Sequence, residues 1–156
     1  MVKIKEVYDF IDSFAPFSTQ ADFDNSGFLV GDINRYIRHV GVVLDVTQQT
    51  LAAARHLGVD LIITHHPVIF DATRSFTAGN MAFELAAAGI AAISAHTSLD
   101  CAAGGVNDVL AGLLEIEKTE PSPPPITPQV SCALASSSKT VQRIWRNMSG
   151  ISCVQR

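Results

Sequence analysis

Short apolar runs alternate with amphipathic segments through the middle of the chain. The runs at 40–44, 60–64 and 90–94 are rich in valine, isoleucine, leucine and alanine, with few polar residues between them. Such runs are typical of strands that are buried on both faces of a parallel sheet. The segments at 48–57 and 81–88 carry apolar residues at helical spacing, and a glycine follows each. The pattern predicts an α/β fold, with right-handed βαβ units in a layered α-β-α domain and a mainly parallel sheet.

Apolar residues at helical spacing predict one more helix on each side of this region. Residues 3–14 place apolar side chains one turn apart, with charged residues between them, and Pro16 ends the helix. Residues 106–114 have the same character. The segment 95–105, which precedes the predicted helix at 106–114, is expected to be a loop.

The composition changes at about residue 117. Proline and serine are frequent in the remaining residues, and no helical or strand period is sustained there. Proline lacks a backbone donor and is poorly accommodated inside helices and central strands. We therefore predict an α/β domain over residues 1–117 and a weakly structured tail over residues 118–156.

Charge and cysteine content narrow the range of functions. The formal net charge is −4 at pH 7 and no basic patch stands out, so the chain is not expected to bind nucleic acid. No apolar run is long enough to span a membrane, and the first residues contain no apolar signal segment. The three cysteines lack metal-binding spacing, which predicts reduced thiols in a cytoplasmic protein. Cys101 is expected to be a buried thiol, with a soft metal ligand or a nucleophile as alternatives.

Residues that can bind metal ions follow each of the three predicted strands. Asp45 follows the first strand, His65 and His66 the second, and His96 and Asp100 the third. The carboxyl ends of parallel strands meet at one edge of a sheet, and ligands bind there in such folds. Imidazole together with carboxylate suits Zn, Mn, Fe, Co or Ni. The sequence therefore predicts a divalent-metal site at this edge.

Other roles for these residues stay open at this point. Pro67 favours extended backbone at His66, and neighbouring side chains of an extended chain point to opposite sides. The pair of His65 and His66 is therefore expected to serve two ions, or one ion and a group beside it. The histidines could instead cap backbone carbonyls. Thr47 can cap the helix at 48–57, and Asp45 is expected to be an N-cap of this helix rather than a site residue.

Five segments of the chain, in this order, resemble one known family. They are 24–27 (Asp-Asn-Ser-Gly), 44–47 (Leu-Asp-Val-Thr), 60–67 (Asp-Leu-Ile-Ile-Thr-His-His-Pro), 94–100 (Ser-Ala-His-Thr-Ser-Leu-Asp) and 104–108 (Gly-Gly-Val-Asn-Asp). Together they resemble the Nif-three-like, or YbgI-like, family, which is also called GTP cyclohydrolase I type 2. The resemblance covers residues 1 to about 117, and five motifs in register make it specific.

The resemblance implies a metal site, an activity and an assembly. It implies an α/β fold with a centre of up to two divalent metal ions, in a toroidal homohexamer. His65, His66 and Asp100 are implied as metal ligands, with His96 close to the metals. The family label implies hydrolysis of a nucleotide-like small molecule through opening of the purine ring of GTP. In that reaction His96 or Asp45 would act as acid or base.

The chain departs from the family pattern after residue 117. The family completes its site with a histidine and a glutamate near a C-terminus well beyond residue 156, and no histidine follows His96 here. Three protein ligands can hold one metal ion, whereas two ions would be under-ligated. We therefore expect a truncated or frame-shifted family member, which is a hydrolase, a non-enzymatic metal-binding or regulatory scaffold, or an inactive product. Family-like sequence in another reading frame past codon 117 would support the frameshift.

Overall fold

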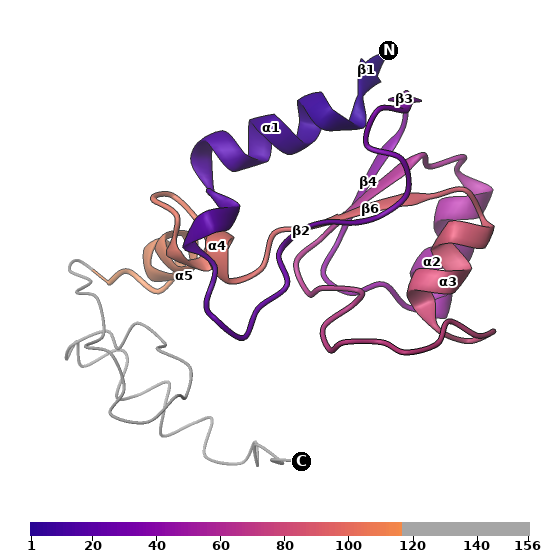
Figure 1. Cartoon of the computed structure of the whole chain (residues 1–156). Helices are drawn as coiled ribbons and strands as arrows, with labels where there is room; N and C mark the ends of the chain where they lie inside the picture. The colour runs from indigo at the N-terminus through magenta and orange to yellow at the C-terminus, as the bar shows by residue number, and fades with distance from the viewer. Residues whose placement is uncertain (117–156) are drawn as a thin grey trace. The chain divides into compact units, whose positions relative to one another are not determined.

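The first part of the chain folds around a four-stranded sheet (Figure 1). The computed structural model describes residues 1–116. The elements in chain order are β1 (Val2–Lys3), α1 (Ile4–Phe14), the 3-10 helix η1 (Phe17–Thr19), β2 (Gly27–Val30), β3 (Tyr36–Ile37), β4 (Val40–Val43), α2 (Gln48–His56), β5 (Leu61–Thr64), α3 (Met81–Ala87), β6 (Ala91–Ser94), α4 (Thr97–Cys101) and α5 (Val106–Leu113). Residues Met1–Gly105 form one compact unit, and α5 belongs to a second unit.

The sheet is mainly parallel, as the sequence predicts. Its strand order is β2-β6-β5-β4, and β1 pairs with β3 in a separate two-stranded sheet. The pairs β4–β5 and β5–β6 are parallel, with Val43 opposite Thr64 and Thr64 opposite Ser94. These three strands therefore end at the same level. β2 is antiparallel to β6 and was not assigned as a strand from the sequence. Gly31 turns the chain after β2, because its φ is +110° and an added Cβ would lie 2.8 Å from Ala91 Cβ.

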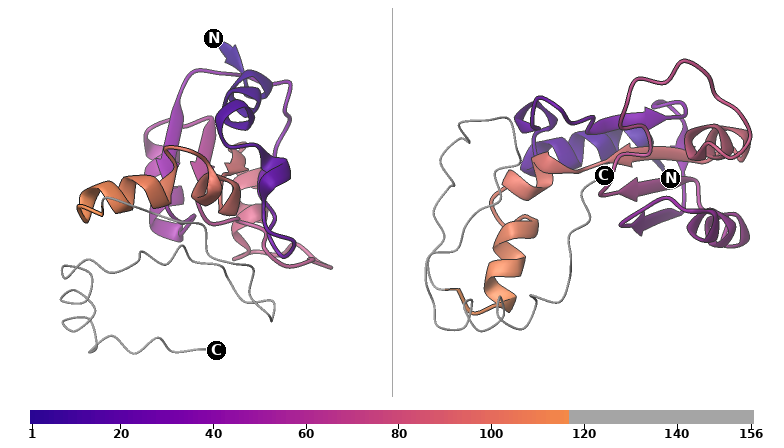
Figure 2. Two further views of the ribbon diagram at one scale, coloured as in Figure 1. Left: turned by 90° about the vertical axis from the view of Figure 1, so that its left-hand side faces the viewer. Right: turned by 90° about the horizontal axis from the view of Figure 1, so that it is seen from below.

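Helices cover both faces of the sheet, which confirms the layered α/β architecture. From β4 to β5 and from β5 to β6 the chain crosses to the next strand in the same direction along the sheet. Because such crossovers are right-handed, their helices α2 and α3 lie on the same face of the sheet, side by side (Figures 1 and 2). The core on that face comprises Val30, Leu51, Ala54, Ile62, Ala82, Leu85, Ile90 and Ala92. The core beneath α1 on the other face comprises Ile4, Ile11, Phe17, Ile37, Leu61, Ala91, Ile93 and Ala95.

The prediction that the strand at 40–44 is buried on both faces was wrong. β4 is an edge strand of the sheet, and Val42 is 77% exposed. The core beneath α1 draws residues from β5 and β6 but none from β4. One face of β4 is therefore uncovered in residues 1–116, although Val43 packs towards α2 and α3.

The segment at 95–105 is not the simple loop that the sequence predicts. It contains the short helix α4, whose first turn is formed by Leu99 and Asp100 donating their backbone N–H groups to the carbonyl of His96. Cys101, at the end of α4, is exposed rather than buried. The predicted tail, residues 118–156, lies outside the described residues. Within residues 1–116 no helix has the length and apolar character needed to cross a membrane.

Candidate metal centre

β5 delivers His65 and His66 to the carboxyl edge of the sheet. The strand ends at Thr64, and the next two residues form a bend that still bonds to the last residue of β4 and to the residue after it. The N–H of His65 donates to the carbonyl of Val43 at 3.2 Å, and the N–H of His66 donates to that of Leu44 at 3.1 Å. The buried Thr64 hydroxyl lies 3.0 Å from the carbonyls of both Leu44 and His66, so it ties the bend in place.

β6 delivers His96 to the same edge. Ser94, opposite Thr64 in the sheet, donates its hydroxyl to the carbonyl of His65 at 3.0 Å. The chain then leaves the sheet, and the N–H of His96 donates to Ser26 Oγ at 3.1 Å. His96 is therefore held between the end of a central strand and the loop that precedes β2.

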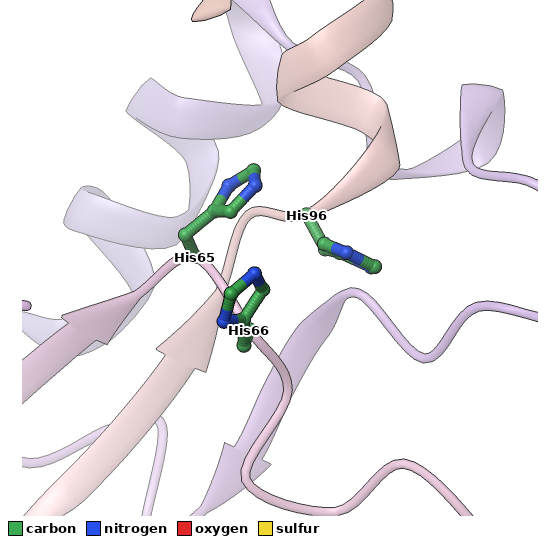
Figure 3. Close-up of side chains that lie close together, drawn as sticks. All are labelled: His65, His66 and His96. Atoms are coloured by element: carbon green, nitrogen blue, oxygen red, sulfur yellow. The ribbon is translucent and has the colours of Figure 1, made fainter. Parts of the chain in front are cut away.

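The three histidines gather in one group just beyond the strand ends (Figure 3). The ring centroid of His65 lies 5.0 Å from that of His66 and 5.1 Å from that of His96, and the remaining pair is 5.6 Å apart. Each ring offers one nitrogen to the group, and these nitrogens lie within 4.8 Å of one another. We call His65, His66 and His96 the histidine triad.

The triad corrects one geometric prediction. Neighbouring histidines in extended chain would point to opposite sides, yet His65 and His66 both contribute to one group. The reason is that β5 stops at Thr64, so the two residues lie in a bend rather than in a regular strand. The rule that neighbouring side chains point to opposite sides applies to the extended strand but not to the bend.

Each histidine of the triad has a hydrogen-bond acceptor at Nδ1. For His65 it is the carbonyl of Ala95 at 3.0 Å, for His66 it is Asp45 Oδ1 at 2.7 Å, and for His96 it is Asp24 Oδ1 at 3.0 Å. Carbonyls and ionised carboxylates only accept hydrogen bonds, so each Nδ1 must carry the proton. In the neutral form of each ring the lone pair then lies on Nε2, which is the arrangement found in metal-ligating histidines.

Asp45 lies at the triad rather than at the helix start. The expected role of Asp45 as the cap of α2 was wrong. The prediction that Thr47 can cap this helix is confirmed, because its hydroxyl accepts from the N–H of Thr50 at 3.2 Å. The Asp45 carboxylate instead holds His66. Its side chain is 52% exposed and that of His66 47%, so solvent screens this interaction strongly.

Asp24 is the carboxylate that sequence reasoning missed as a site residue. Its side chain is fully buried beside His96. Burial raises the pKa of Asp24, but hydrogen bonds from Thr97, His96 and Ser26 outweigh this effect and bring the pKa down to about 2. The sequence placed Asp24 in the segment 24–27 that carries the family resemblance, and that was its only signal.

The low pKa of Asp24 predicts a pH-dependent contribution to stability. The ordinary value is 3.8, so the ionised form is favoured in the folded state. The contribution is therefore fully present above about pH 4 and is lost as the pH falls towards 2, by about 2 kcal/mol. Urea unfolding of the chain and of Asp24→Asn should give a stability difference that shrinks by this amount between pH 5 and pH 2. Parallel pH profiles would contradict the prediction.

Asp100 lies beside the triad. Its Oδ1 is 3.7 Å from Nε2 of His65, with side chains 28% and 18% exposed respectively. This is too long for a hydrogen bond, and the group of atoms that meet within 4.8 Å consists of the three histidines. The structure thus brings His65, His66 and His96 together, with Asp45 bonded to the triad and Asp100 at its side.

The triad fits a divalent metal ion in its donor chemistry. Three imidazoles that can offer Nε2 suit Zn, Cu, Fe or Ni, and three histidines with an open position are a known zinc ligand set. Nitrogens around a tetrahedral zinc with bonds of 2.0–2.1 Å lie roughly 3.3 Å apart. One nitrogen of each ring lies within 4.8 Å of the others, so the three nitrogens approach the spacing that a zinc ion requires.

The fold and the triad together define an α/β protein with a candidate metal centre at the carboxyl edge of a parallel sheet. The sequence profile of Duf34/NIF3 (NGG1p interacting factor 3) matches residues 2–154. The chain belongs to this family.

Individual relatives agree with this assignment. A "GTP cyclohydrolase 1 type 2 homolog" from Methanocaldococcus jannaschii is 37% identical over 125 residues, covering 77% of this chain and 50% of the relative. A Bacillus subtilis protein of the same name is 36% identical, covering 79% of this chain and 34% of the relative. The chain thus spans between a third and a half of the length of these two relatives.

Solved structures show the same fold. The Bacillus cereus protein related to NIF3 superimposes with a TM-score of 0.73 at 33% identity, covering 78% of this chain and 36% of that one. Reduced HcgD from Methanocaldococcus jannaschii gives a TM-score of 0.70 at 38% identity, covering 77% and 50% of the two chains. The family match reaches residue 154, whereas each of these pairwise matches covers about three quarters of the chain. The boundary at residue 117 stays a prediction.

Proposed function

We propose that this chain binds a divalent metal ion through the histidine triad and takes part in the hydrolysis of a nucleotide-like substrate. The observation that carries the proposal is the meeting of three imidazoles whose Nδ1 atoms are all bonded to acceptors, which leaves Nε2 for the ion. Similarity to proteins named GTP cyclohydrolase 1 type 2 homolog supports the reaction class. When bound, a divalent ion polarises a substrate oxygen and lowers the pKa of water.

The protein side chains around the triad have separate tasks in this proposal. Asp45 holds His66, and because its carboxylate is half exposed it can also exchange protons with water at the site. His96 binds the ion as a member of the triad instead of acting as a free acid or base. Asp100 lies close enough to His65 to add a carboxylate ligand after a small movement, as the family resemblance implies.

Two phenylalanines near the triad favour a planar substrate. The ring centroid of Phe70 lies 6.3 Å from that of His96, and Phe23 lies 6.4 Å from Phe70. Both side chains are about half exposed. The loops that carry them are joined, because Asn25 Nδ2 donates to the carbonyl of Ile69 at 2.7 Å. Exposed aromatic rings stack on nucleobases, which supports a purine nucleotide as the substrate.

The test is metal-dependent turnover of GTP by the purified chain. We expect loss of the purine absorption band in the presence of Zn²⁺, Mn²⁺ or Co²⁺, and no loss after the metal is removed with a chelator. The double variant His65→Ala with His66→Ala should be inactive. A double variant of two exposed histidines elsewhere, His39→Ala with His56→Ala, is the matched control and should keep the activity. Turnover that survives the loss of His65 and His66 would refute the proposal.

A second candidate is a metal-binding scaffold without catalytic activity. It rests on the histidine triad alone, which could hold an ion whether or not a reaction follows. Stoichiometric metal in the purified protein without GTP turnover would support this candidate. The same sample, measured for its mass in solution, would test the homohexamer that the resemblance implies. Absence of bound metal after loading would exclude both candidates.

A further inference from the structure

The most densely bonded buried group next to the triad is the Asp24 carboxylate. Oδ1 accepts from the N–H of Asn25 at 2.6 Å and from Nδ1 of His96 at 3.0 Å. Oδ2 accepts from the Ser26 hydroxyl at 2.8 Å, from the N–H of Thr97 at 3.0 Å and from the Thr97 hydroxyl. One carboxylate thus binds the loop before β2 to the corner between β6 and α4.

We propose that Asp24 is the positioning residue of the site, which fixes the ring orientation and the tautomer of His96 so that Nε2 is presented to the metal. The presentation of Nε2 to a metal rests on the proposed metal-binding function. The tautomer and orientation of His96 rest on the hydrogen bonds alone. Asp24 does not touch the metal or the substrate in this role. It acts through His96.

The other two acceptors at the triad are weaker candidates for this control. His65 bonds to a backbone carbonyl, which no side-chain substitution changes. Asp45 is half exposed, so water can replace it at His66. The Asp24 side chain is fully buried and that of His96 is 19% exposed, so the bond at Nδ1 is far less accessible to solvent than the one at His66. Control of ring orientation is therefore concentrated at Asp24.

The two oxygens of Asp24 make the effect of Asp24→Asn predictable. An amide presents one acceptor and one donor group, whereas all five neighbours of Asp24 donate. Each oxygen faces one fixed backbone N–H, that of Asn25 at Oδ1 and that of Thr97 at Oδ2. The amide oxygen keeps three of the five donors at the place of Oδ2 but only two at the place of Oδ1, so we expect it at Oδ2. The amide NH₂ then faces His96, whose Nδ1 must become the acceptor. The proton moves to Nε2, and the nitrogen needed by the metal is blocked.

The experiment reads the tautomer of His96 in the metal-free protein by long-range ¹⁵N–¹H NMR, with His96→Gln used to assign the signal. The full chain should show the Nδ1–H tautomer and Asp24→Asn the Nε2–H tautomer. Co²⁺ titration, followed by its visible absorption, should show affinity weakened about 10–100-fold in Asp24→Asn. The matched control is Asp22→Asn, which removes the same charge from an exposed position in the same loop and should change neither readout.

Three results distinguish failure of the positioning role of Asp24 from failure of the proposed metal function. An Nε2–H tautomer of His96 in the unsubstituted protein overturns the inference, even if Asp24→Asn does not fold. An unchanged tautomer in folded Asp24→Asn, or a loss of affinity no larger than in Asp22→Asn, overturns it as well. If the unsubstituted chain binds no Co²⁺ but has the Nδ1–H tautomer that Asp24→Asn reverses, the proposed metal function fails while the positioning of His96 by Asp24 is supported.

Discussion

Replacing any one of His65, His66 or His96 with alanine is expected to weaken Zn²⁺ or Co²⁺ binding by at least about 100-fold. The reason is that each ring supplies one of the three nitrogens that meet within 4.8 Å. Loss of a supporting residue around a metal already costs about 10–100-fold, and loss of a ligand costs at least as much. Isothermal titration of the chelator-treated protein with each ion measures the effect.

The histidine variants need one control and one comparison. His56→Ala removes an exposed histidine at the end of α2, so it should leave affinity unchanged. An equal loss in His56→Ala, or full affinity in His96→Ala, would contradict the triad as the ligand set. A loss in Asp100→Asn as large as that in His96→Ala would add Asp100 to the ligands.

Ile93→Ala is expected to lower the free energy of unfolding by about 2–5 kcal/mol. Ile93 is fully buried in the middle of β6, in the core beneath α1. Truncation removes buried methyl groups and leaves a cavity that close-packed neighbours fill only in part. Urea unfolding followed by circular dichroism measures the change.

The control for Ile93→Ala is Val42→Ala in the same sheet. Val42 is 77% exposed on the edge strand β4, so its truncation should change stability by less than about 0.5 kcal/mol. A comparable loss in both variants would contradict the assignment of the core to β5 and β6. It would also mean that the exposed face of β4 is covered in solution.

Much of the fold could be predicted from the sequence because it rests on local periodicity. The apolar runs at 40–44, 60–64 and 90–94 correspond to β4, β5 and β6, and the glycine-terminated helical segments correspond to α2 and α3. β2 was missed because its four residues carry no clear period, and it is stabilised by pairing with β6. α4 was missed because it is only five residues long and its first residue, Thr97, is anchored by a distant carboxylate.

The candidate site was predictable in its members but not in its geometry. The position of His65, His66 and His96 after strands indicated where they would gather, because parallel strands end at one edge. Their convergence depends on the bend after Thr64, which a rule for extended chain does not describe. Asp24 was not assigned as a site residue, because it is 72 residues away from His96 in the chain and its only signal was its place in the segment 24–27.

The sequence by itself determined the alternation of β4, α2, β5, α3 and β6, the parallel pairing of these strands and the identity of the histidines, because these depend on residue type and spacing along the chain. Only the tertiary structure decided that one face of β4 is exposed, that Asp45 holds His66, and that the Asp24 side chain is buried against His96. The physical reason is that burial and hydrogen-bond partners between distant segments depend on how the layers pack. No local pattern encodes which loop will supply the acceptor for a given histidine.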